Sequence, residues 1–205
     1  MIENNQQESK AKSGLKKALI VYSSRAGCTE EVALRIKEQL ENSSIATEVV
    51  KVNEKKQFKK LYEQDISEFT SILLGTSIIA GKFHKNINKF LTKLESTNID
   101  DKKLGFFICC MKACDTEKAT EAINEYIEPN LNAYNLPFSI IDAFGGKLDF
   151  SPNSSMNFMV KQLLKKIMLK DNPDLEDIEP KVYDFRDWDQ INKFASSWVK
   201  VNSSA

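Results

Sequence analysis

A short run of hydroxylated and small residues carries the clearest chemistry in this sequence. In YSSRAGCTE, residues 22–30, a buried strand gives way to a helix, so the first backbone N–H groups converge at the positive end of that helix. Ser24 and Thr29 add hydroxyl donors, and Gly27 allows close backbone approach and a positive φ. The loop therefore predicts a site for a terminal phosphate, formed by Ser23, Ser24, Arg25, Ala26, Gly27, Cys28 and Thr29. The alternative is an ordinary turn with Thr29 as N-cap.

Cysteine and histidine could add redox or proton chemistry. Cys109, Cys110 and Cys114 are close in sequence, but they form no CxxC pair and His84, the single histidine, is distant, so no metal site is predicted. Together with Cys28 they are expected to remain thiols, packed as small hydrophobes or placed beside a redox group. His84 could deliver a proton near neutral pH as a catalytic residue. The alternative is a solvated or capping histidine.

Short β-rich runs alternate with helical stretches along the chain. Strands are expected over residues 18–22, 46–52, 69–78, 104–111 and 137–144, and helices over residues 29–40, 85–94, 116–134 and 187–199. Pro129 weakens the third of these helices. The alternation predicts an α/β fold, with a doubly wound, five-stranded parallel sheet in the flavodoxin-like order 2-1-3-4-5.

Composition fits one domain with a full core. The chain has 205 residues, 41% of them hydrophobic, and its 29 Lys plus Arg balance its 29 Asp plus Glu. No excess of positive charge favours nucleic acid, so a small-molecule partner is expected. Residues 1–14 lack the apolar segment of a secretory signal and are predicted to be a flexible polar tail before a single domain over residues 15–202. No apolar run approaches the roughly 18 residues that span a bilayer, so a cytoplasmic protein is expected.

Residues 151–170 do not fit the alternation and are predicted to be a helical insertion after the fifth strand. Over residues 156–170 the apolar residues share one helical face, four lysines lie mostly off it, and no acid occurs between Asp149 and Asp171. Such a helix could make a peripheral contact with an anionic membrane, or it could cover a partner site. The alternative is a helix packed on the protein's own core.

The loop resembles the first-strand loop of flavodoxins, in which an aromatic residue is followed by Ser/Thr, two residues, Gly, one residue and Thr. Tyr22, Ser24, Gly27 and Thr29 match that pattern, whereas Ala26 replaces a threonine of many flavodoxins. A narrower resemblance, over nearly the whole chain after Gly14, is to the menaquinone-dependent protoporphyrinogen dehydrogenase family. It rests on YSSRAGCT (22–29), LLGTSIIAGKFH (73–84), the insertion, and YDFRDWDQINKFA (183–195).

The resemblance implies bound FMN, with the flavin ring between two further loops. One side would be lined by Thr76, Ser77, Ile78, Ile79, Ala80 and Gly81, and the other by Cys110, Met111, Lys112, Ala113, Cys114 and Asp115. Gly145 and Gly146 are expected near the same rim. Where family members usually carry basic and aromatic residues in the second loop, this chain has Ile78, Ile79, Ala80 and Lys82, and Lys82 and Lys112 could substitute for the basic ones. The third loop lacks the aromatic residue that often stacks on the flavin. The flavin face is therefore expected to be open to a planar partner.

Three functions follow from this resemblance. The leading hypothesis is an FMN-dependent oxidoreductase of the protoporphyrinogen-dehydrogenase-like group, which passes electrons from a planar reduced substrate or protein donor to a quinone-type acceptor. The second is a flavodoxin-type electron carrier, whose partner is a redox protein. The third is a binding module without flavin, because a fold alone does not imply catalysis.

Overall fold

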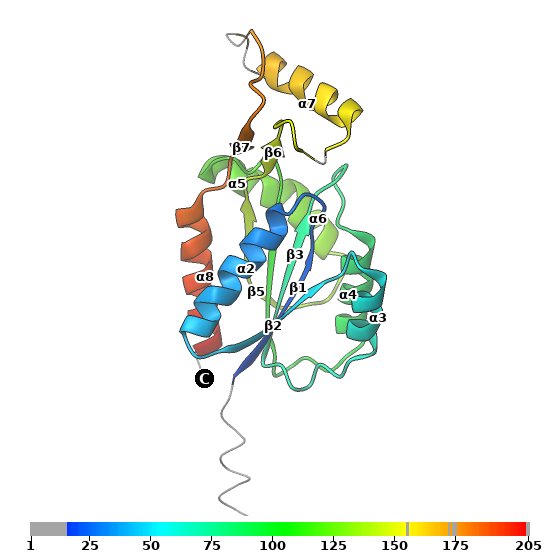
Figure 1. The fold of residues 1–205 in the computed structure, drawn as a ribbon. Helices are drawn as coiled ribbons and strands as arrows, with labels where there is room; N and C mark the ends of the chain where they lie inside the picture. Colours follow the sequence, from blue (N-terminus) through cyan, green and yellow to red (C-terminus); the bar gives the residue numbers. More distant parts are fainter. Residues whose placement is uncertain (1–15, 155, 172, 174–175, 204–205) are drawn as a thin grey trace, which may run out of the picture.

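A five-stranded parallel sheet forms the centre of the protein, as Figure 1 shows. The computed structural model describes residues 16–203 except residues 155, 172 and 174–175, so the tail predicted over residues 1–14 lies outside the described residues. The strand order is β2-β1-β3-β4-β5, which confirms the predicted order. The strands are β1 (Lys17–Ser23), β2 (Ala46–Lys51), β3 (Ser71–Ser77), β4 (Lys103–Cys109) and β5 (Phe138–Phe144).

Helices cover both faces of this sheet, which explains why the central strands are almost entirely apolar. On one face α2 (Cys28–Asn42) packs beside α8 (Trp188–Ser203), around the fully buried Trp198. The other face carries α3 (Lys55–Glu63), α4 (Lys85–Glu95) and α5 (Thr116–Ala122), and its core includes Phe90 and Phe106. The register places the carboxyl ends of β1, β3 and β4 side by side, with Ser23 opposite Thr76 and Ser77 opposite Cys109.

Two helical regions differ from the sequence-based expectation. Helix α3 was not predicted, because Leu61 is its one buried residue and lysines occupy much of its remaining length. Residues 116–134 form α5, a π-helical turn η1 (Ile123–Ile127) and the short α6 (Glu128–Leu131), where one helix was expected. Pro129 has no N–H to continue an α-helical ladder, and the wider π turn accommodates that loss.

The insertion forms a small layer beyond the carboxyl end of the sheet, at the top of Figure 1. Strands β6 (Lys147–Asp149) and β7 (Val182–Asp184) pair antiparallel at its base, and α7 (Phe158–Asp171) lies above them. One side of α7 packs on a satellite core of Leu148, Phe150 and Ile178. The two short strands were not predicted, because three-residue runs carry little periodicity.

No helix in the described part of the chain combines the length and the apolar content required to cross a membrane.

Candidate functional site

The loop between β1 and α2 has the geometry of an anion site. Gly27 is the N-cap of α2 and has a φ of 81°, so the residue type that tolerates this conformation stands where the chain turns into the helix. Ser23, Ser24 and Thr29 are buried, and none of their hydroxyl oxygens has a nitrogen or oxygen partner among the described residues. Buried hydroxyls are normally hydrogen-bonded, so three orphans at a helix N-terminus fit a bound phosphate.

Neighbouring elements hold this loop in place. The Ser24 N–H donates to Asn53 Oδ1 at 2.8 Å, which ties the loop to the segment after β2. The Tyr22 hydroxyl donates to Glu30 at 2.8 Å, and Lys51 forms an ion pair with the same carboxylate at 2.7 Å. Contacts within the protein therefore fix the loop, as expected for a preorganised site.

The second loop turns on two residues with positive φ. Ile79 and Lys82 exchange backbone hydrogen bonds of 3.2 and 3.1 Å around Ala80 and Gly81, whose φ angles are 50° and 73°. Positive φ at both central positions is the pattern of a type I′ turn. Asn130, which follows the π-helical turn, donates to the Gly81 carbonyl at 3.2 Å. The irregular helix thus holds the tip of the second loop.

The third loop divides into a part beside Gly146 and a part that contacts α5. Cys110 is buried, and the Met111 side chain lies against Gly146, where an added Cβ would meet its sulfur at 2.7 Å. Lys112 instead pairs with Glu121 and Glu125, and Asp115 caps α5 by accepting from the Lys118 N–H at 2.8 Å. These interactions direct the later part of the loop toward α5.

A cleft of about 190 Å³ lies where the three loops meet. Of the predicted residues, its lining includes Ser24, Arg25, Ala26, Cys28, Thr29, Ser77, Ile78, Ile79, Cys110 and Met111, together with Gly146. The predicted residues outside that lining are Ser23, Gly27, Thr76, Ala80, Gly81, Lys112, Ala113, Cys114 and Asp115, with His84 in a neighbouring pocket. Cys109, Lys147 and Leu148 also line the cleft. Sequence reasoning missed Lys147 and Leu148 because β6 was not recognised.

Two thiols lie at the floor of the cleft. A hydrogen bond from Cys109 lowers the pKa of Cys28, against burial, and the positive charge of Arg186 adds to this effect. Burial raises the pKa of Cys109 well above its usual value. Cys28 also donates weakly to the Gly145 carbonyl at 3.7 Å. Among the described residues the cysteines are free thiols, and no group of three or more His, Cys, Asp and Glu side chains could hold a metal ion.

His84 begins α4 at the edge of an adjoining pocket of about 300 Å³. Its Nδ1 accepts from the Asn86 N–H at 3.2 Å, so it serves as N-cap in its neutral form. Burial, with help from the charges of Arg25 and Lys85, lowers the pKa of His84 below its usual value. The geometry accounts for a capping role, and a catalytic role remains a prediction.

This pKa shift predicts how stability depends on pH. Because the folded protein favours neutral His84, the contribution of this residue is fully present above the pKa of an unfolded histidine, near 6.5, and decreases as pH falls toward the lower folded pKa. We expect His84→Asn, which keeps an N-cap oxygen, to lose less stability than wild type between about pH 7.5 and pH 5.5. Urea unfolding at both pH values measures this. Parallel losses in the two proteins would contradict it.

The fold and the phosphate-loop geometry define the class of protein. Residues 19–177, more than half of the chain, match the model of the Flavodoxin domain family, and the chain belongs to this family. Within that class it is similar to the protoporphyrinogen IX dehydrogenase (quinone) of Escherichia coli strain K12. The two are 24% identical over 179 residues, which cover 87% of this chain and 92% of that protein.

Solved structures support the same fold. A short-chain flavodoxin associated with a non-canonical PDU bacterial microcompartment aligns with a TM-score of 0.51 and 16% identity, over 92% of this chain and 99% of that one. Rubredoxin oxygen:oxidoreductase from Desulfovibrio gigas aligns with a TM-score of 0.52 and 12% identity over 98% of this chain. The alignment spans 40% of that longer protein. At such identities the likeness establishes the fold alone.

Proposed function

We propose that this protein binds FMN and acts as an oxidoreductase of the protoporphyrinogen-dehydrogenase-like group. The observation that carries the proposal is the set of three buried, unpartnered hydroxyls, Ser23, Ser24 and Thr29, at the start of α2. The adjoining cleft suits a flavin whose phosphate these hydroxyls would hold. Similarity to the E. coli dehydrogenase supports the same reaction class.

Different residues would bind the phosphate of FMN and orient its ring. FMN, when bound, supplies the one- and two-electron chemistry. The phosphate loop anchors one end of the cofactor, while Ser77 to Ile79 and Cys110 to Met111 would flank the ring. Met111 is 37% exposed and no aromatic residue occupies its loop, so the outer face is open to a planar substrate or a quinone.

A basic pocket beside the cleft supports a substrate that carries carboxylates. Arg25, Lys82, His84 and Lys85 line it, and it shares Arg25, Ser77 and Ile79 with the cleft. In the described part of the chain Arg25 and Lys82 form no ion pair, so their charges are available to an anion. A porphyrinogen presents such carboxylates at the rim of its macrocycle.

The test is an anaerobic assay of the purified protein. We expect the visible absorption of an oxidised flavin, and saturable oxidation of protoporphyrinogen IX with menaquinone as acceptor. Electron exchange with redox proteins but no saturable small substrate would favour the electron carrier. Protein that purifies without flavin and binds none when FMN is added would favour the third hypothesis, a binding module without flavin.

The tip of the second loop tests where the open edge lies. Ala80→Trp adds bulk at a position that already carries a Cβ at positive φ, and we expect quinone reduction to fall by about tenfold or more while FMN stays bound. Lys103→Trp, at an exposed position at the opposite end of β4, is the matched control. Steady-state kinetics and flavin content measure both effects. An unchanged rate in Ala80→Trp would place the site elsewhere.

The outer side of α7 supports a peripheral membrane contact. Phe158, Met159 and Leu163 are 72%, 78% and 59% exposed although the inner side of the helix is packed. Lys166 and Lys170 are exposed on the same helix, whereas Lys165 pairs with Asp177 at 3.3 Å. An apolar surface with free cations fits the interface of an anionic membrane, where a quinone would be found.

Two variants separate the parts of this contact. Each lysine near an anionic surface contributes about 1 kcal/mol, so Lys166→Glu/Lys170→Glu should reduce vesicle binding by roughly tenfold or more. This difference from wild type should disappear at high salt, which screens the charges. Phe158→Ser/Met159→Ser should weaken binding at every salt concentration. Co-sedimentation with vesicles rich in phosphatidylserine measures both. If wild type stays in the supernatant, α7 does not attach the protein to membranes.

A further inference from the structure

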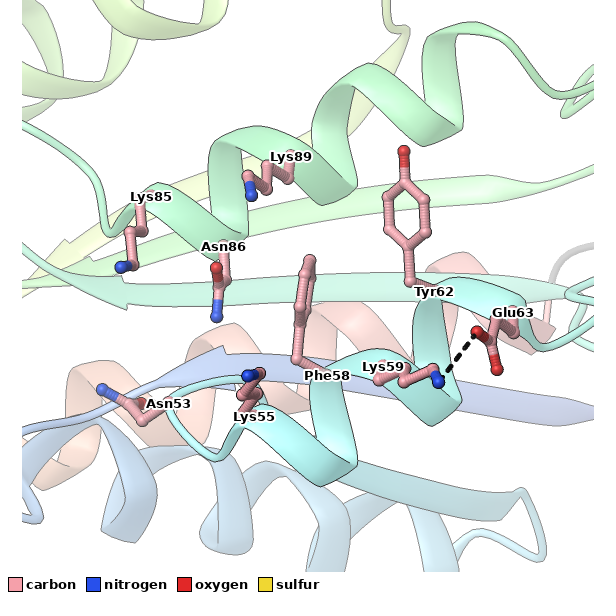
Figure 2. Close-up of a pocket in the computed structure, with 9 residues that line it drawn as sticks. All are labelled: Asn53, Lys55, Phe58, Lys59, Tyr62, Glu63, Lys85, Asn86 and Lys89. Atoms are coloured by element: carbon pink, nitrogen blue, oxygen red, sulfur yellow. Dashed lines mark ion pairs between the residues drawn. The ribbon is translucent and has the colours of Figure 1, made fainter.

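A groove of about 460 Å³ separates α3 from α4 (Figure 2). The rings of Phe58 and Tyr62 point from α3 toward α4, with their centroids 5.6 Å apart. Four lysines share the lining, which is completed by two asparagines and one acid: Asn53, Lys55, Lys59, Glu63, Lys85, Asn86 and Lys89. The groove is larger than the proposed flavin cleft and has a different, basic and aromatic, character.

Most lysines of this groove form no ion pair within the described part of the protein. Lys59 reaches Glu63 at 3.9 Å on the surface. Lys55, Lys85 and Lys89 form no ion pair or side-chain hydrogen bond with any described residue. A cluster of unpaired cations raises the local potential even though the chain as a whole has a net charge of zero.

Helix stability does not account for these lysines. Lys55 and Lys85 are the first residues of α3 and α4, and neither helix has an acid in its first turn. Cations at a helix N-terminus oppose the helix dipole, so both positions are unfavourable for the helices themselves. Figure 2 shows that the two helix starts lie at the same end of the groove, near Asn53. Lysines and dipoles therefore add their positive potentials at one place.

The groove is held rigidly. Lys93 of α4 donates to the carbonyls of Leu61, Tyr62 and Gln64 at 3.2, 2.7 and 2.8 Å, which fastens the end of α3. At the other end the Asn86 side chain donates to the Val52 carbonyl at 2.7 Å. A surface held at both ends is suited to docking, because little order has to be gained on binding.

The groove is continuous with the proposed flavin site. Asn53, which lines the groove, accepts the 2.8 Å hydrogen bond from the phosphate-loop Ser24. Lys85 lines both the groove and the basic pocket, and that pocket shares Arg25 with the cleft. A basic strip thus runs from the cleft across the second loop to α3.

We infer that the α3–α4 groove docks the carboxylate-rich face of an acidic electron-donor protein. Complementary charge is the recognition chemistry, and the exposed edge of Tyr62 supplies an apolar contact inside the charged area. The inference rests on the proposed flavin function and names the class of the protein donor, which would reduce the flavin as an alternative to the small reduced substrate. Each encounter would oxidise the donor by one electron and reduce FMN by one. Two encounters, with two protons from solvent, complete the reduction.

Binding can be tested separately from electron transfer. The probe is an acidic plant-type ferredoxin with gallium in place of iron, which keeps the acidic surface and removes redox activity. We expect it to bind both the flavin-free and the FMN-loaded chain in calorimetry, with affinity falling as salt rises from about 20 to about 200 mM. Binding to the flavin-free chain keeps a failure of docking distinct from a failure of flavin function.

Charge reversal locates the contact. Lys55→Glu/Lys89→Glu should weaken ferredoxin binding by roughly tenfold to a hundredfold at low salt. Folding should be retained, because an acidic side chain suits the first turn of α3. Lys103→Glu/Lys193→Glu changes the same charge at exposed positions on β4 and α8 and should bind as wild type does.

Several results would overturn the inference. Absence of ferredoxin binding to wild type, equal binding by the groove variant, or equal weakening in the control pair would each do so. So would tighter lysine-dependent binding of a single-stranded oligonucleotide, which would indicate a nucleic-acid surface. With native iron, the reduced ferredoxin should reduce the FMN-loaded wild type faster than the groove variant by the same factor. In the reverse direction, electron transfer from the reduced flavin to basic cytochrome c should not be slowed in the groove variant, because the lysines repel a cationic protein.

Discussion

Removing the three orphan hydroxyls of the phosphate loop is expected to abolish tight FMN binding without unfolding the protein. Ser24→Ala and Thr29→Val each delete a hydroxyl that has no nitrogen or oxygen partner among the described residues. A hydrogen bond to a charged group contributes roughly 1.5–3 kcal/mol, so each change should weaken FMN binding by about tenfold to a hundredfold. The combination with Ser23→Ala should approach the product of the separate effects.

The same substitutions should not lower the stability of the flavin-free protein. A buried hydroxyl without a partner costs roughly 1–3 kcal/mol, so its removal should leave the flavin-free chain at least as stable as wild type. Ser71→Ala is a matched control, because Ser71 is also buried and unpartnered but lies at the start of β3, at the end of the sheet away from the loop. It should raise stability and leave FMN affinity unchanged.

Fluorescence titration with FMN and riboflavin, together with urea unfolding of the flavin-free chains, measures both sides of this prediction. Wild type should prefer FMN strongly, and the triple variant should bind the two flavins similarly. Equal affinity of wild type for FMN and riboflavin would show that the loop does not bind a phosphate. A large loss of stability in the flavin-free variants would show that the hydroxyls serve the fold.

The sequence was sufficient to predict the sheet and the loop that joins β1 to α2, because both depend on local patterns. Strands buried on both faces appear as short apolar runs, and the loop joins a strand and a helix that are adjacent in sequence. The positive φ expected at Gly27 is observed. Thr29 is not the N-cap that the alternative expected, because α2 begins at Cys28 and its N-cap is Gly27, two residues earlier.

The parts that sequence reasoning missed depend on contacts between distant segments. Helix α3 buries little besides Leu61, so it shows a weak core-facing pattern, although it forms one wall of the basic groove. Lys147 reaches the cleft through the pairing of β6 with β7, whose partners lie more than thirty residues apart. Asp115 looked available to the flavin, but its role as the cap of α5 depends on where that helix starts.

Arg186 links the insertion to the phosphate loop, and its replacement should have the second largest effect. Its side chain is 3% exposed and forms ion pairs with Asp184 at 2.6 Å and Glu31 at 2.8 Å, above the Trp188 ring. Glu31 lies in the first turn of α2, directly after the loop. Arg186 therefore joins the segment after β7 to the helix whose N-terminus would hold the phosphate.

Arg186→Met keeps an unbranched, flexible side chain, which is shorter, and removes the charge. Loss of one partner of a fully buried ion pair costs about 3–5 kcal/mol, but Glu31 and Asp184 are 42% and 35% exposed. Solvent will relieve part of that cost, so we expect a loss of about 2–3 kcal/mol. Urea unfolding at neutral pH measures it, and a loss below about 1 kcal/mol would mean that the cluster is not a structural link.

The pH dependence of this loss follows from the pKa shifts. The hydrogen bond from Arg186 lowers the pKa of Asp184, and although burial opposes it, bonds from Lys147 and Arg186 lower the pKa of Glu31. Carboxylates with lowered folded pKa values stabilise the protein above their unfolded pKa values, near 4, and that contribution is lost as pH falls through the folded values. The difference between wild type and Arg186→Met should therefore shrink in acid.

The same variant should also weaken FMN binding, by a route that a second substitution can reverse. Without Arg186, the positive charge of Lys147 balances only one of the two carboxylates, Glu31 and Asp184, near the proposed phosphate. The remaining negative charge repels the phosphate, and we expect roughly a tenfold loss of FMN affinity. Adding Glu31→Gln to Arg186→Met removes that charge and should restore affinity without restoring stability. If affinity stays low in the double variant, Arg186 positions the loop through packing, and its effect on FMN does not arise from charge.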